Sequence, residues 1–531
     1  MRMLRRAIAA LLCLVAPLAA TAEDVTLTSR DGAIEISGTL RGFDGEFYRV
    51  ETPYGILTVD GEAVVCTGPA CPEIGAWVPE IVLSGSPALA RTLVPDLITT
   101  FAARRGWVAE IEVRSATETA FVLRPARNSK PVARFTIVSA TSRDGLDAIL
   151  EGRADMAMTV RAVQVDEAAR ARKLGLGRLD TPELTRVVAL DALVAASAPQ
   201  NPIGRISAPD LAGILSGEID NWRALGWVDA PIVVHLPTIE SGFGEAVAQQ
   251  IVDATGITLR GDIHWHGSVA ELADAVAADP LAFGVLPWSQ SLSARPLAIA
   301  GSCGFGVTAS ADTIRTADYP LVTPLTLVLA ARRLPLVGRE FLDFLTTPAA
   351  SQTAERAGFV GQAPAEIPLA RQGERLANAI AAAGQEIGLD ELKRLAEAMR
   401  GSRRLTATFR FRPGGTEFTT QSAANVELLA RDLEAGAFDG RRLRFVGFSD
   451  GQGPADANRE LSRARAAAVR DAILAAAPAA DMSRTPIEID AFGEALPMAC
   501  DDTPDERGIN RRVEIWLDRA AASAEADTDQ R

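Results

Sequence analysis

The sequence predicts a multidomain α/β protein that begins with a small β module. Its 531 residues correspond to about three or four domains of ordinary size, and 48% hydrophobic with 23% charged residues is typical of globular chains. Short alternating strands separated by turns such as Asp-Gly fill residues 24–66. Apolar strand-like runs alternate with helical periodicity over residues 77–366, and a further α/β pattern covers residues 405–519.

Residues 1–22 are predicted to be a signal peptide. Three arginines within the first six residues precede an apolar run ending at Leu18, and Ala20-Thr21-Ala22 has the small residues that signal peptidase requires. The alternative is a membrane anchor, although the run is too short to span a bilayer. Cleavage changes the formal charge from 54 − 68 = −14 to 51 − 68 = −17. We therefore expect a protein of the periplasm of a Gram-negative bacterium, and its acidity disfavours nucleic acid as a partner.

Four cysteines remain after cleavage, and an even number in an oxidising compartment suggests disulfides. Cys66 and Cys71 flank the turn Thr-Gly-Pro-Ala, which predicts a small disulfide-closed loop. Cys303 and Cys500 are far apart in the sequence, and either a bridge between two domains or two buried thiols would fit.

The patterns divide the chain into six segments. Residues 367–404, rich in Ala, Leu, Glu and Arg, are interpreted as connecting helices, and the last residues are small and polar. The expected order is a signal peptide 1–22, a β-barrel-like module 23–72, a two-lobed α/β domain 73–366, a helical linker 367–404, a second α/β domain 405–519 and a flexible tail 520–531.

Four motifs follow one another in the first α/β domain. They are Ile81-Val82-Leu83-Ser84-Gly85-Ser86, Leu215-Ser216-Gly217-Glu218-Ile219-Asp220-Asn221-Trp222, Glu240-Ser241-Gly242 and Ala282-Phe283-Gly284-Val285. In this order they resemble the phosphate-type (PstS-like) periplasmic solute-binding proteins of ABC transporters, over roughly residues 80–360. The resemblance implies a type II periplasmic-binding-protein fold, a small oxyanion held between two lobes, and an ABC permease as a candidate partner.

The candidate anion ligands are hydroxyls and backbone N–H groups at helix starts, together with one arginine. Such groups bind an oxyanion without a metal, and arginine adds a planar fork of donors. Each serine alone is more simply a helix cap, a role that does not exclude anion binding. The predicted set is Ser84, Ser86, Ser139, Ser142, Thr159, Arg161, Ser241 and Gly242.

Several positions depart from the family pattern. Pro87-Ala88 occupies the first loop, where family members carry a threonine, and Phe243 stands where the family's Ser-Gly-Thr has its threonine. Pro237 replaces an arginine that often lies four residues before the serine. The position of the family's acid, which discriminates protonated phosphate, falls near Val160. Each change removes a donor or an acceptor. Phosphate, another oxyanion, a larger ligand, or a lobe with no ligand at all would each fit this pattern.

The second α/β domain carries the most specific motif. A strand that ends at Asp450 is followed by a turn, a helix containing Asn458 and Arg465, and the closing run Asn510-Arg511-Arg512-Val513-Glu514. These spacings resemble the OmpA-like peptidoglycan-binding domain, from about residue 405 to 517. The resemblance implies that Asp450 takes the ammonium and Arg465 the carboxylate of diaminopimelate in the peptidoglycan stem. The alternative is an ordinary Asp–Arg surface pair.

Helical geometry supports this pocket and predicts the core of its helix. Asn458 and Arg465 are 465 − 458 = 7 residues apart, about two turns or roughly 10 Å on one helix face. The predicted buried stripe of this helix is Leu461, Ala464, Ala468, Ala472 and Ile473.

These features favour a binding protein over an enzyme. The sequence has no nucleophile elbow, Walker loop or zinc-protease motif, and no cofactor is expected. His264-Trp265-His266 has no clear partner for a metal, so none is predicted. The leading hypothesis is a periplasmic receptor for a small oxyanion that is tethered to peptidoglycan and associated with the cell wall or outer membrane. The alternative is an envelope scaffold whose receptor-like lobe no longer binds phosphate.

Overall fold

The computed structural model describes residues 24–72, 77–127, 130–291, 293–384, 386–412 and 417–518. The predicted signal peptide and C-terminal tail lie outside these residues. The chain forms two compact units, one of residues Met1–Pro79 with Arg333–Leu336 and one of residues Glu80–Arg332 with Val337–Arg531. Within the described ranges, no helix has the length and apolarity needed to cross a bilayer.

The first unit contains a five-stranded antiparallel sheet in the order β4-β3-β2-β1-β5. Val25, Leu27, Tyr48 and Val50 form its buried core. A disulfide joins Cys66 in β5 to Cys71, with the two Cα atoms 5.8 Å apart. The order places β4 and β5 at the two ends of the sheet. The strands are β1 (Val25–Ser29), β2 (Glu35–Phe43), β3 (Phe47–Thr52), β4 (Gly55–Asp60) and β5 (Val64–Thr67).

The second unit begins with a two-lobed receptor-like domain built on one long sheet, in the order β14-β13-β15-β11-β19-β10-β6-β9-β8-β7. Its first lobe contains parallel pairs, β10 with β6 and β6 with β9, which the α/β alternation of the sequence predicts. The elements of this lobe are β6 (Glu80–Gly85), α1 (Val94–Arg104), β7 (Trp107–Val113), β8 (Glu118–Pro125), β9 (Ala133–Ser139), α2 (Ser142–Leu150), β10 (Met156–Thr159), α3 (Val165–Lys173), α8 (Leu336–Leu345) and α9 (Pro348–Arg356).

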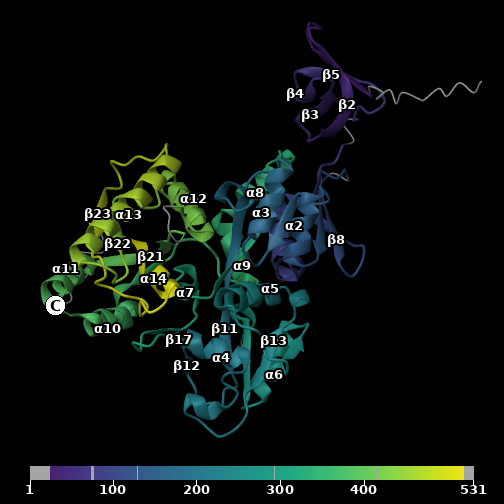
Figure 1. Ribbon diagram of the computed structural model, residues 1–531. Coiled ribbons are helices and arrows are strands. Elements are labelled where there is room, and N and C mark those ends of the chain that lie inside the picture. Colours follow the sequence, from purple (N-terminus) through teal and green to yellow (C-terminus); the bar gives the residue numbers. More distant parts are fainter. Residues whose placement is uncertain are drawn as a thin grey trace, which may run out of the picture. The chain divides into compact units, whose positions relative to one another are not determined.

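Two long strands, β11 (Thr185–Ser197) and β19 (Val322–Leu329), connect the lobes (Figure 1). The first half of β11 pairs with β19 and its last residues pair with β15. The elements of the second lobe are β12 (Arg205–Ile206), α4 (Ala208–Ser216), β13 (Val233–Pro237), α5 (Phe243–Val247), β14 (His264–His266), α6 (Val269–Ala278), β15 (Ala282–Pro287), β16 (Arg295–Pro296), β17 (Ala298–Ala300), β18 (Gly306–Val307) and α7 (Ala311–Arg315).

The motif that ends at Trp222 forms a core element of the second lobe. Helix α4 ends at Gly217, whose φ of 86° is the left-handed conformation that glycine adopts without strain. Trp222 is fully buried, and its Nε1 donates to the Leu281 carbonyl at 2.9 Å. The indole therefore ties the turn after α4 to the segment before β15.

Asp191 is a buried carboxyl on the connecting strand β11. Burial raises the pKa of Asp191 to about 6, although hydrogen bonds from Ser289 and Ala192 lower it. An unfolded aspartate has a pKa near ~3.9, so this group stabilises the fold below that pH and the contribution is lost as pH rises through the folded value. We expect Asp191→Asn to reduce the loss of stability between about pH 4 and about pH 6.5 in urea unfolding. An equal loss in the variant and the wild type would contradict this.

The C-terminal domain has a five-stranded sheet in the order β20-β21-β24-β22-β23. Helices α10 and α11, predicted as a linker, pack against this sheet through Ala379, Leu395 and Met399, which contact a core that contains Trp516. The elements are β20 (Glu366–Pro368), α10 (Gly373–Ala382), α11 (Leu389–Met399), β21 (Ser402–Phe409), α12 (Thr420–Glu434), β22 (Leu443–Phe448), α13 (Ala455–Ala476), β23 (Ile487–Ala491), α14 (Pro504–Asn510) and β24 (Arg512–Asp518).

The predicted buried stripe of α13 is wrong at three of its five positions, Leu461, Ala464 and Ala468, which are exposed. Ile473 is buried as predicted, Ala472 is half-buried against the core, and the helix also buries Asn458, Ser462, Ala466 and Val469. The cause is close packing of α13 on β22. A Cβ added at Gly447 would lie 2.0 Å from the Ser462 carbonyl oxygen, so only small residues fit between helix and strand.

Two strong links hold the C-terminal domain to the receptor-like domain. A disulfide joins Cys303, in the β17–β18 loop of the second lobe, to Cys500 before α14. Of the two alternatives for these cysteines, the bridge between domains is therefore correct, and the pair of buried thiols is not. The buried carboxylate of Asp318 accepts hydrogen bonds from Arg404 at 2.6 and 3.1 Å and from Arg410 at 3.1 Å. The second lobe and the C-terminal domain are therefore joined both covalently and by buried charge.

Candidate functional sites

The structure brings several predicted anion ligands together between the lobes. Ser86, at the end of β6, lies against Gly242 of the second lobe, where an added Cβ would be 2.6 Å from the Ser86 hydroxyl. The Ser86 hydroxyl is buried without a hydrogen-bond partner among the described residues. Ser142 begins α2, and Arg161 follows β10. These groups meet where the sequence places the oxyanion.

Other predicted ligands are engaged elsewhere. The Thr159 hydroxyl bonds to that of Thr326 at 2.5 Å, between β10 and β19. The Ser241 hydroxyl donates to the Thr238 carbonyl at 2.7 Å. Ser84 is buried at the end of β6, and the hydroxyl of Ser139 is buried without a described partner. Thr159 and Ser241 are therefore structural hydrogen-bonding residues in this conformation.

A carboxylate of the protein itself lies at the expected anion position. Glu245, on α5 of the second lobe, accepts hydrogen bonds from the backbone N–H groups of Ser142 at 2.6 Å and Arg143 at 3.1 Å. These are the first two amides of α2, which have no partner within the helix and favour negative charge. Glu245 also accepts from Arg161 Nε at 3.4 Å. An internal oxyanion thus links the two lobes.

Arg161 is already paired on both sides of its guanidinium. Its Nη1 and Nη2 atoms donate to Glu167 at 2.9 and 2.6 Å, and both residues are buried. Burial lowers the pKa of Arg161, but hydrogen bonds and charge from Glu167, with a further contribution from Glu245, raise it above its ordinary value. Two carboxylates therefore share one guanidinium, and an incoming anion would meet net negative charge.

Sequence reasoning did not identify Glu245 or Glu167. Glu245 lies three residues after Gly242, on a short helix whose spacing gives no sign that it contacts the other lobe. Glu167 does carry a local signal, since it is the third residue of α3, where acids commonly cap the helix start.

The C-terminal domain brings Asp450, Arg465 and Arg511 into one polar pocket. Asp450 follows β22, and its Oδ2 accepts from Arg511 Nη1 at 2.8 Å. Arg465 Nη1 is buried and has no hydrogen-bond partner among the described residues. Burial lowers the pKa of Arg465, as does the charge of Arg511, whereas Asp450 raises it. The pocket thus holds one acid, two arginines and an unused donor, which suits a ligand with both an ammonium and a carboxylate.

Asn458, the third residue predicted for the peptidoglycan site, contacts Glu494 and the turn that follows Asp450. It is buried, and its amide donates to Glu494 Oε2 at 2.6 Å and to the Gly453 carbonyl at 3.3 Å. Burial raises the pKa of Glu494, while the hydrogen bond from Asn458 opposes the shift. Asn458 therefore orients Glu494 and the turn after Asp450.

The closing Asn-Arg-Arg run divides into structural and pocket residues. Asn510 accepts from the backbone N–H groups of Met498 and Ala499. Arg512 is fully buried, donates to Glu514, and lies over the ring of Phe448 at 4.3 Å. Arg511 was missed as a pocket residue, because sequence alone could not separate it from its structural neighbours.

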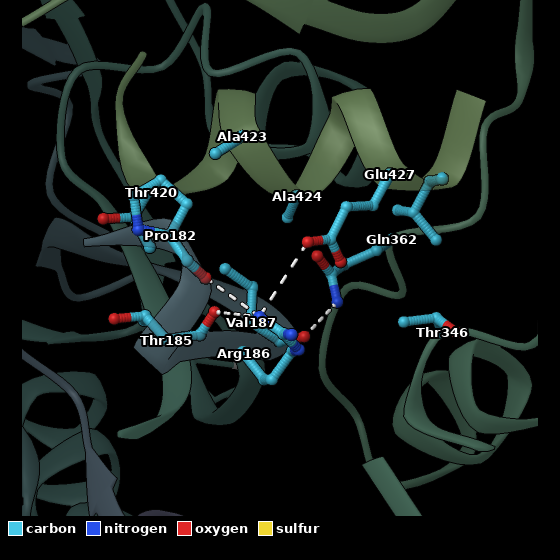
Figure 2. Close-up of a pocket in the computed structure, with 11 residues that line it drawn as sticks. Pro182, Thr185, Arg186, Val187, Thr346, Gln362, Thr420, Ala423, Ala424 and Glu427 are labelled. Carbon is cyan, nitrogen blue, oxygen red and sulfur yellow. Dashed lines mark hydrogen bonds and ion pairs between the residues drawn. The ribbon is translucent and has the colours of Figure 1, made fainter. Parts of the chain in front are cut away.

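A separate cleft lies between the first lobe and α12 (Figure 2). Gln362 donates to the Val187 carbonyl at 2.6 Å, and Arg186 Nη1 lies 3.8 Å from a carboxylate oxygen of Glu427 (Figure 2). An adjoining cavity of about 260 Å³ includes Leu345, Gln362 and Leu428 among its lining residues. Neither opening contains a predicted site residue.

Comparison with known families defines the class of each domain. Residues 111–349 match the model of the PBP superfamily domain, and residues 410–511 match the model of the OmpA family. The chain therefore combines a region that matches the PBP superfamily domain with a region that matches the OmpA family.

Individual relatives are similar to one or the other part. The phosphate-binding protein PstS of Borreliella burgdorferi is 23% identical over 199 residues, which cover 36% of this chain and 71% of that protein. An ABC-type phosphate transport receptor from Vibrio cholerae is 20% identical, covers 53% of this chain and 99% of its own, and has a TM-score of 0.41. The peptidoglycan-associated lipoprotein of Burkholderia pseudomallei is 22% identical, covers 21% of this chain and 89% of its own, and has a TM-score of 0.19.

Proposed function

We propose that this is a periplasmic envelope protein that attaches to peptidoglycan through the pocket of Asp450, Arg465 and Arg511. The observation that carries the proposal is the unpaired, buried Nη1 of Arg465 beside the Asp450–Arg511 ion pair. A buried charged donor without a partner is costly, so a carboxylate ligand at this position would satisfy it. Diaminopimelate supplies that carboxylate, and its ammonium fits Asp450.

For the receptor-like domain, the contacts of Glu245 favour the scaffold hypothesis over the oxyanion-receptor hypothesis. Glu245 takes the two helix-start amides and part of the guanidinium that a free anion would need. A bound phosphate would have to displace this carboxylate and then lie near the remaining charge of Glu167. The domain then serves as a closed interaction module, with no catalytic role and no permease required.

Anion titration of the full mature chain separates these two hypotheses. We expect wild-type protein to give no calorimetric heat with phosphate or sulfate. Glu245→Ala should destabilise the protein by about 2 kcal/mol, because two amides and one guanidinium nitrogen lose a charged acceptor. Added acetate or phosphate should then raise the melting temperature of this variant by replacing the carboxylate.

The control is Glu240→Ala, which removes an exposed acid a few residues earlier in the same lobe. Its melting temperature should match the wild type and should not respond to added anions. Saturable phosphate binding by the wild type would overturn the scaffold hypothesis and restore the oxyanion receptor, with Glu245 as a displaceable group.

A further inference from the structure

All three histidines of the chain form one cluster at the edge of the second lobe. Strands β13 and β14 are parallel neighbours, and their register pairs His235 with His264. His266 lies two residues further along β14, so its side chain is on the same face as that of His264. The His264-Trp265-His266 motif has no evident metal-binding partner in the sequence. His235, 31 residues earlier than His266, is that partner.

Two imidazole nitrogens are already spaced as ligands of one ion. His235 Nδ1 and His266 Nε2 are 3.0 Å apart. Two nitrogens that each lie ~2.0–2.1 Å from one metal ion are separated by roughly 3 Å in tetrahedral or octahedral geometry. The His264 ring is stacked on that of His235 with centroids 5.0 Å apart, so rotation of His264 could supply a third nitrogen.

Two acids carry negative charge close to the cluster. Asp279 interacts electrostatically with His235, and Glu271 with His266. Glu271 lies in the first turn of α6, and Asp279 directly follows its last residue. Their negative charge favours a bound cation.

We propose that His235, His264 and His266 form a binding site for a borderline divalent transition-metal ion such as Zn²⁺. His235 Nδ1 and His266 Nε2 are the first two ligands of the metal ion, and a ring nitrogen of His264 is the third. An all-imidazole set favours Zn²⁺, Cu²⁺ or Ni²⁺ over Mg²⁺ or Ca²⁺, which prefer oxygen ligands. This site is independent of the anion position and of the peptidoglycan pocket.

The scarcity of histidine makes the test direct. Full mature protein without a histidine tag, labelled with ¹⁵N-histidine, is titrated with ZnCl₂ at about pH 7.5. We expect the ring-nitrogen signals of His235 and His266 to shift and to saturate at one equivalent of Zn²⁺. His266→Gln should weaken Zn²⁺ binding in calorimetry by at least about tenfold, with a smaller loss for His264→Gln.

His266→Gln is the decisive variant because His266 is partly exposed, and the protein should tolerate its loss better than that of His235. Glu218→Gln is the matched control, since this exposed acid of the same lobe lies outside the histidine cluster, and the variant should bind Zn²⁺ like the wild type. The proposal is overturned if no histidine signal moves at about tenfold excess Zn²⁺. Equal affinity in wild type and His266→Gln would also overturn it, and would leave the 3.0 Å contact as a hydrogen bond between two neutral rings.

Discussion

Asp450→Ala and Arg465→Ala should each reduce retention of the protein on purified sacculi at least tenfold. Hydrogen bonds to charged groups contribute ~1.5–3 kcal/mol each, and each variant removes one half of the recognition of a zwitterionic ligand. Asp450→Ala also leaves Arg465 and Arg511 next to each other without the acid that separates their charges. Arg511→Ala should give a smaller loss, because Arg511 acts by orienting Asp450.

The matched control is Arg463→Ala, an exposed arginine on the same helix α13. Its retention should equal that of the wild type, which separates specific recognition from general attraction to the cell wall. Free diaminopimelate should compete with sacculi for the wild-type protein. Unchanged retention of both pocket variants would mean that the protein attaches to the wall through another surface.

Asp318→Asn should destabilise the protein by about 3–5 kcal/mol, the largest stability effect that we expect from a single substitution. Asp318 is buried between the domains, and its carboxylate pairs with both Arg404 and Arg410. Their charges hold the pKa of Asp318 well below its usual range, although burial alone would raise it. Removal of the negative charge leaves two buried guanidinium groups without the acid that they share, while Arg404 keeps its ion pair with Glu514.

The free energy of unfolding is measured in urea, by tryptophan fluorescence and by the gel mobility of the protein with its disulfides intact. The control is Asp229→Asn, which breaks an exposed pair with Arg223 and should cost at most ~1 kcal/mol. Because the folded pKa of Asp318 is depressed, its stabilisation is present above the unfolded value of ~3.9 and is lost as pH falls below it. A loss equal to that of Asp229→Asn would show that the ion cluster does not stabilise the domain interface.

The sequence predicted those features that depend on local pattern and fixed spacing. The turn between α4 and Trp222 and the meeting of Asp450 with Arg465 follow from residues close together in the chain. The contact of Glu245 with Ser142 and of His235 with His266 could not be predicted, because each joins elements whose relative position is set only by the folded sheet. Polar contacts across a lobe boundary have no periodicity to detect.

The buried face of α13 shows a different limit. Hydrophobic periodicity selected Leu461, but the helix packs so closely on Gly447 that Ser462 and Ala466 face the sheet instead. The size of the residue, and not its hydrophobicity, decided the orientation. Ser462 is acceptable in the core because its hydroxyl donates to the Arg459 carbonyl at 2.9 Å and accepts from the Gly493 N–H at 3.2 Å.

The C-terminal domain contacts both lobes and therefore restricts their movement relative to each other. Cys303–Cys500 fixes it to the second lobe, while Arg412 donates to the Asp180 carbonyl at 2.6 Å and Arg431 to that of Thr346 at 2.6 Å, both in the first lobe. A free two-lobed receptor can swing open about its connecting strands. Here the same swing would have to break the contacts to the first lobe, so the domain that we propose to bind the wall also limits the movement of the two lobes.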